Sequence, residues 1–66
     1  ANDASRVRIC LGSLKPALQT IMRLAFYDDL TYGEISEVEG IAVGTVKTRV
    51  FHAKRLLMHC LGRDPN

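Results

Sequence analysis

Residues 30–61 read LTYGEISEVEGIAVGTVKTRVFHAKRLLMHCL and predict a short helix, a tight turn and a long second helix. Thr31 and Glu34 have the spacing of a capping box, in which each side chain satisfies a free backbone N–H at the start of a helix. Gly40 should end that helix, because glycine readily adopts the left-handed conformation of a C-cap. Two helices joined by a short turn that contains glycine are typical of a helix-turn-helix.

The long second helix should begin near Val43, after a poor cap at Ala42, and should end before Gly62 and Pro65. Its apolar residues recur at helical spacing and predict one buried stripe: Val46, Val50, Ala53, Leu57, Cys60 and Leu61. Gly44 is unfavourable in a first helical turn. Its presence suggests that backbone, another helix or DNA approaches closely there.

Two more helices are expected before this pair. The first should cover about Ala4 to Leu11, with Asn2, Asp3 or Ser5 as its cap. The second should start at Pro16, which suits the first position of a helix, and should run to Phe26 or Tyr27. Their inward residues, together with those of the third helix, are expected to be Val7, Cys10, Leu11, Leu14, Leu18, Ile21, Ala25, Leu30, Ile35, Val38 and Ile41. The fold class is therefore all-α, a small four-helix bundle over residues 1–62 that contains a helix-turn-helix with a long recognition helix, followed by a tail at 63–66.

The helix that starts at Pro16 carries more apolar surface than one partner helix needs, because Met22, Leu24 and Phe26 widen its apolar face. Burial on several sides of a small bundle explains this surface. The alternative is that Met22 and Phe26 dock another protein.

The net charge of the chain is only +2, but its acidic and basic residues lie in different segments. Acidic residues gather between Asp28 and Glu39, and a basic segment without any acidic residue follows Gly40. Such segregation gives one face suited to an anionic partner. The sequence has neither a membrane-spanning apolar run nor an apolar N-terminal signal, so we expect a cytoplasmic location.

The two cysteines, Cys10 and Cys60, lie in apolar surroundings far apart in the sequence. We expect buried thiols that act as small hydrophobic side chains. A Cys10–Cys60 bridge stays possible if the first and last helices pack together.

The face of the long helix opposite its apolar stripe has the residue types that contact a DNA major groove: Lys47, Thr48, Phe51, His52 and Arg55. Lysine and arginine reach guanine acceptors or phosphates, and threonine and phenylalanine can touch the thymine methyl group. Arg49 and Lys54 flank this face and suit phosphates. A solvated basic face is the alternative, but the preceding short helix and turn favour DNA binding. No metal-ligand spacing or nucleophile–base pair is present, so we expect no enzyme, no metal site and no cofactor.

Three segments of the chain together carry a resemblance to a known family: Leu14–Leu18 (LKPAL), Phe26–Ile35 (FYDDLTYGEI) and Gly40–Leu56 (GIAVGTVKTRVFHAKRL). With them the chain resembles region 4 of bacterial sigma factors of the extracytoplasmic-function type. It implies a promoter-binding domain that reads the element near −35 and brings RNA polymerase to the start site. It also implies that Lys47, Thr48, Phe51 and His52 face the bases or adjoining backbone, and that Arg49, Thr45 and Tyr32 lie near phosphates.

Family members also dock this domain on the flap of the polymerase β subunit, and many are held inactive by an anti-sigma factor. The resemblance therefore implies these partners as well as promoter DNA.

Two residues depart from the family pattern: His52 stands where many members have arginine, and Glu39 stands where leucine is usual. The alternatives are a module that chiefly binds an anti-sigma factor or the flap, and a LuxR-type regulator output domain, which would dimerise on a palindromic site.

Overall fold

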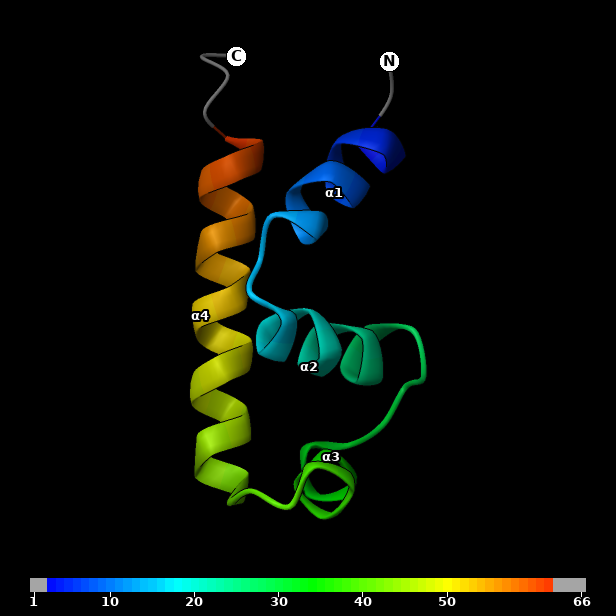
Figure 1. Cartoon of the computed structure of the whole chain (residues 1–66), viewed down its shortest axis with the longest axis vertical. Helices are drawn as coiled ribbons and strands as arrows, with labels where there is room; N and C mark the ends of the chain where they lie inside the picture. Colours follow the sequence, from blue (N-terminus) through cyan, green and yellow to red (C-terminus); the bar gives the residue numbers. More distant parts are fainter. Residues whose placement is uncertain (1–2, 63–66) are drawn as a thin grey trace.

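Four α-helices make up residues 3–62, the part of the chain that the computed structural model describes (Figure 1). They are α1 (Asp3–Gly12), α2 (Pro16–Phe26), α3 (Tyr32–Glu39) and α4 (Val43–Leu61). The all-α expectation and the four helices are confirmed to within two residues at each boundary. The proposed cap Asn2, the stop at Pro65 and the tail at 63–66 lie outside the described residues.

The long helix α4 runs beside all three other helices (Figure 1). It packs against α1, α2 and α3 in turn, and α2 also packs against α3. Figure 1 shows α1 beside the C-terminal half of α4 and α3 near its N-terminal end. The helix that carries the basic face is therefore also the one to which the rest of the fold is attached.

The core lies where α2, α3 and the N-terminal part of α4 meet. Ile21, Ile35 and Val46 are fully buried at its centre. The remaining buried members of the cluster are Leu14, Leu18, Met22, Leu24, Val50 and Ala53. The predicted stripe of α4 is confirmed, although Leu57, Cys60 and Leu61 are only half-buried because α4 extends beyond α2.

Local chemistry sets the helix boundaries as predicted. Pro16 occupies the start of α2. The Thr31–Glu34 capping box is formed: the Glu34 N–H donates to Thr31 Oγ1 (3.1 Å), and the Thr31 N–H donates to Glu34 Oε1 (2.8 Å). Gly40 ends α3 with a φ of 69° in the left-handed region. The Ser36 hydroxyl donates to the Ile41 carbonyl oxygen, which fixes the turn between α3 and α4.

One expectation about the apolar residues of the first three helices is wrong. Val38 does not face inward but is 61% exposed. The helix α3 is short, and its contacts with α2 and α4 cover only the side that holds Ile35. The expected burial of this helix on several sides is confirmed for Met22, which lies in the core because α2 packs against both α3 and α4. Phe26, by contrast, remains 54% exposed.

Cys10 and Cys60 form a disulfide that joins α1 to the last turn of α4. The expectation of two free thiols is therefore wrong, and the alternative bridge is present. Packing of α1 on α4 brings the two Cα atoms to 5.9 Å, within the usual range for a disulfide. A second contact lies beside it, because the Arg6 guanidinium donates to the Leu61 carbonyl oxygen at 2.7 Å. That bond satisfies one of the carbonyl groups left free at the end of a helix.

Candidate nucleic-acid interface

The exposed face of α4 brings together five of the predicted site residues: Lys47, Thr48, Phe51, His52 and Arg55. A helix turns by about 100° per residue, so these side chains point away from the buried Val46, Val50 and Ala53. Phe51 is 63% exposed, although an aromatic ring of this size is normally covered. The structure thus presents cationic, polar and aromatic groups on one face of one helix.

Arg55 lies over the exposed ring of Phe51, with its guanidinium carbon 6.0 Å from the ring centroid. This separation fits a cation–π contact. The arrangement covers part of the ring and restrains the guanidinium group. The two side chains therefore form one unit that can meet a base and a phosphate together.

The Thr48 hydroxyl donates to the Gly44 carbonyl oxygen at 3.0 Å, one turn earlier in α4. Such back-bonding is common for threonine within helices. Because this bond uses its proton, the hydroxyl is left as an acceptor toward solvent. Thr48 is therefore suited to an amino donor or to a methyl contact on a base edge.

Two of the remaining predicted residues, Arg49 and Thr45, lie at the edges of this face, and the third, Tyr32, lies on α3. Arg49, Thr45 and Tyr32 are half-buried, and Tyr32 packs against the core. The start of α4 has no side-chain cap at Ala42. Within the described residues, the first amide hydrogen bonds of α4 are those of Thr45 and Val46 to the Ala42 carbonyl oxygen. The earlier amides at this end are free to meet a phosphate.

Lys54 does not extend outward as its flanking position suggested. Its ammonium nitrogen lies 5.4 Å from the centroid of the Phe26 ring on α2. No local sequence pattern signals this pairing, because it depends on how α2 and α4 cross. The Lys54 ammonium group therefore contributes to the contact between α2 and α4.

Charge is divided between the two helices of the motif. The exposed acids Glu34, Glu37 and Glu39 lie on α3, whereas α4 carries no Asp or Glu. DNA is a dense array of negative charge, so the charge of α4 suits a duplex better than that of α3.

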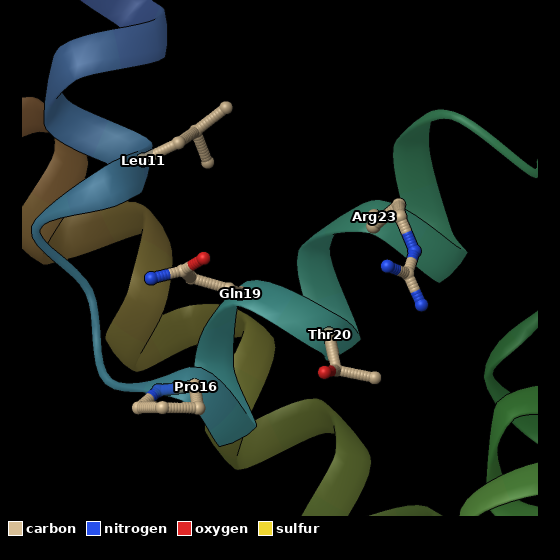
Figure 2. Close-up of a pocket in the computed structure, with 5 residues that line it drawn as sticks. All are labelled: Leu11, Pro16, Gln19, Thr20 and Arg23. Atoms are coloured by element: carbon tan, nitrogen blue, oxygen red, sulfur yellow. The ribbon is translucent and has the colours of Figure 1, made fainter.

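A shallow pocket beside the α1–α2 connection is not part of this face (Figure 2). Leu11, Pro16, Gln19, Thr20 and Arg23 line it. The Gln19 amide donates to the carbonyl oxygens of Leu14 (2.7 Å) and Gly12 (3.3 Å) and so fixes the connection. Figure 2 shows Thr20 and Arg23 pointing away from Gln19. The polar groups do not converge on one point, as they would in a binding site for a small molecule.

A second, apolar groove lies between α1, α2 and α4. Its lining residues are Val7, Leu11, Met22, Phe26, Tyr27 and Leu57. Tyr27 is 73% exposed at its edge. This groove is separate from the α4 face and has a different chemistry. In the described part of the chain, no helix is long and apolar enough to cross a bilayer.

The short helix, the turn fixed by Gly40 and the long helix with its exposed basic face define a helix-turn-helix protein. The family described as Sigma-70, region 4, matches residues 5–57. The chain belongs to this family. The match favours the sigma-factor resemblance over a LuxR-type output domain.

Curated relatives include three proteins named ECF RNA polymerase sigma factor SigK. The one from Mycobacterium sp. (strain JLS) is 36% identical over 61 residues, which are 92% of this chain and 32% of that protein. The protein from Mycolicibacterium vanbaalenii is 34% identical over 92% of this chain and 31% of its own length. The protein from Mycobacterium tuberculosis (strain ATCC 25177 / H37Ra) is 35% identical over 91% and 32%, respectively. The chain thus spans about a third of the length of these relatives. No solved structure matches it significantly.

Proposed function

We propose that this domain binds the −35 element of promoters as the C-terminal domain of an alternative sigma factor and so directs bacterial RNA polymerase to initiate transcription. The observation that carries the proposal is the exposed face of α4, where Lys47, Phe51 and Arg55 stand together in a region 4 domain. The function is one of binding in the bacterial cytoplasm, not of catalysis.

We assign each site residue a contact with a base or with a phosphate according to its position. We assign base contacts to Lys47, Thr48, Phe51 and His52, which occupy the exposed face, and a joint base and phosphate contact to Arg55. We assign phosphate contacts to Arg49 and Thr45 at the edges of the face, and to Tyr32 on α3. An α-helix with its side chains is about 10–12 Å across and fits a major groove about 12 Å wide. Residues at the edges of such a helix therefore meet the phosphate walls of the groove.

A protein partner is the second part of the proposal. The apolar groove beside Phe26 and Tyr27 suits a helix of the polymerase β flap or of an anti-sigma factor, because both rings are exposed at its edge. Rings exposed beside a groove are typical of protein contacts. The partner side of the molecule is distinct from the DNA side, so one domain has surface for both.

Selection of bound duplexes from random DNA at low salt tests the DNA-binding proposal. We expect one asymmetric sequence to be enriched. Lys47→Ala and Arg55→Ala should weaken binding, and each lost phosphate contact should lower the slope of log affinity against log salt by about 0.9. Arg8→Ala is the control, because Arg8 is exposed on α1 outside the face. Unchanged binding of both α4 variants would refute the assignment of the face.

Binding to polymerase tests the apolar groove separately. Phe26→Ala should weaken capture of the domain by the isolated β flap and leave the affinity for the selected duplex unchanged within about twofold, since Phe26 is on α2. If Phe26→Ala loses DNA affinity but keeps flap binding, the assignment of the two surfaces is wrong.

A further inference from the structure

A third depression lies between the α1–α2 connection and the middle of α4. Leu14 and Leu18 are buried members of the core that contribute to its floor. Its polar lining comes from Ser13, whose hydroxyl already donates to the Cys10 carbonyl oxygen, from Lys15, and from two residues of α4, Arg49 and His52. We call this depression the α2–α4 groove. It is separate from the apolar groove and from the pocket of Figure 2, because it shares no lining residue with either.

The α2–α4 groove has a positive lining. None of its lining residues is acidic. Lys15 and His52 are exposed, Arg49 is half-buried, and no carboxylate among residues 3–62 pairs with any of the three. Within the described part of the chain, the Lys15 ammonium group has no hydrogen-bond or ion-pair partner.

The α2–α4 groove is continuous with the candidate DNA face, because His52 belongs to both. At about 100° per residue, Arg49 and Leu56 lie on the flank of α4 that faces α2. A helix seated in a major groove turns its flanks toward the phosphates on either side. The flank that carries Arg49 therefore turns toward one strand of the duplex, and Lys15 lies across the groove from it.

We propose that the α2–α4 groove holds a phosphate of the DNA backbone, with Lys15 as its contact from outside the helix-turn-helix. This inference rests on the proposed function, since it needs α4 to occupy the major groove. Arg49 and Lys15 approach the phosphate from the two sides of the groove, and His52 lies at its edge toward the bases. The contact adds affinity and fixes the angle of α4 on the duplex, but it carries no sequence information.

Salt-dependent binding of the 66-residue chain to its selected duplex tests this contact. Lys15→Ala should lower the log–log salt slope by about 0.9 and should leave the enriched sequence unchanged. Lys15→Arg should keep the slope, because it keeps the charge. Arg23→Ala is the matched control: it removes a cation from the same helix, but Arg23 lines the pocket of Figure 2 and not the α2–α4 groove. Its slope should match that of the unsubstituted chain.

Duplexes that carry one neutral methylphosphonate at a time locate the phosphate. At one position, neutralisation should weaken the unsubstituted chain and Lys15→Arg by a factor of about three, and should leave Lys15→Ala unaffected. If Lys15→Ala keeps the full slope while Lys47→Ala does not, the groove contact is refuted and the proposed function stands. If the unsubstituted chain enriches no sequence, the proposed function fails first and this inference fails with it.

Discussion

Lys54 of α4 places its ammonium nitrogen 5.4 Å from the centroid of the Phe26 ring of α2. The contact joins the helix proposed to read DNA to the helix whose exposed ring lies in the apolar groove. A cation–π contact at an exposed site is worth about 0.5–1 kcal/mol. Lys54→Ala should therefore lower the free energy of unfolding by about that amount, measured by urea denaturation. The effect should vanish in a Phe26→Leu background, and Lys47→Ala, which removes a cation without a ring partner, should not show it.

The Cys10–Cys60 disulfide should supply a large part of the stability of so small a domain. It closes a loop with a sequence separation of 50 residues, for which the loss of chain entropy in the unfolded state corresponds to about 4 kcal/mol. The doubly substituted Cys10→Ala, Cys60→Ala chain should lose about 2–5 kcal/mol of unfolding free energy. Reduction of the unsubstituted chain should give a similar loss. A double variant as stable as the oxidised chain would contradict a stabilising bridge.

The capping box at Thr31 should matter for the orientation of the helix-turn-helix as well as for stability. Thr31→Ala removes the acceptor for the Glu34 N–H and should cost about 1 kcal/mol of unfolding free energy. Glu34→Gln keeps an oxygen that can accept from the Thr31 N–H, so its loss should be smaller than that of Glu34→Ala. Glu37→Ala, at an exposed position of the same helix, is the control. Equal losses for Glu34→Ala and Glu37→Ala would show that the box contributes nothing.

Gly44 allows stability and DNA binding to be separated. A Cβ atom at this position would meet nothing within 4 Å in the domain, so the close approach inferred from the sequence does not come from another part of the described chain. Gly44→Ala should therefore stabilise α4 by about 0.5–1 kcal/mol. If DNA backbone lies against this turn, the same substitution should weaken binding to the selected duplex. Tighter or equal binding would place the backbone farther from Gly44.

Phe51 should influence which sequence is bound more than how tightly DNA is bound. Its ring is 63% exposed and carries no charge, so Phe51→Ala should change the base enriched at one or two positions and leave the salt slope unchanged. Selection from random DNA with both chains measures this. A Phe51→Leu chain tests whether the aromatic ring or only its apolar surface is needed. An unchanged preference in both variants would remove Phe51 from the base contacts.

The features that the sequence predicted well depend on neighbouring residues. The capping box, the Gly40 turn, the start at Pro16 and the buried stripe of α4 each follow from the chemistry of a few adjacent positions. The face with Lys47 and Phe51 also follows, because helical periodicity fixes which side chains oppose the stripe. That these residues contact DNA remains a prediction.

The features that the sequence did not predict depend on how helices pack. Cys10 and Cys60 pair only because α1 lies along α4. Val38 is exposed because none of the described helices covers its side of α3. The same limit applies to Lys54 and Lys15, whose partners or neighbours lie on another helix.

The packing of α1 should make the amide hydrogens of the domain exchange at unequal rates in different regions. Its contacts are mainly with α4, near the end that carries the disulfide, whereas the fully buried residues lie in α2, α3 and the N-terminal part of α4. Structural units with few buried contacts open without global unfolding and exchange their amide hydrogens first. We therefore expect α1 and the last turn of α4, joined by the disulfide, to open together in a lower-energy fluctuation that leaves the N-terminal part of α4 folded. Within residues 3–62, the amides of one long helix should thus differ in exchange rate between its two ends.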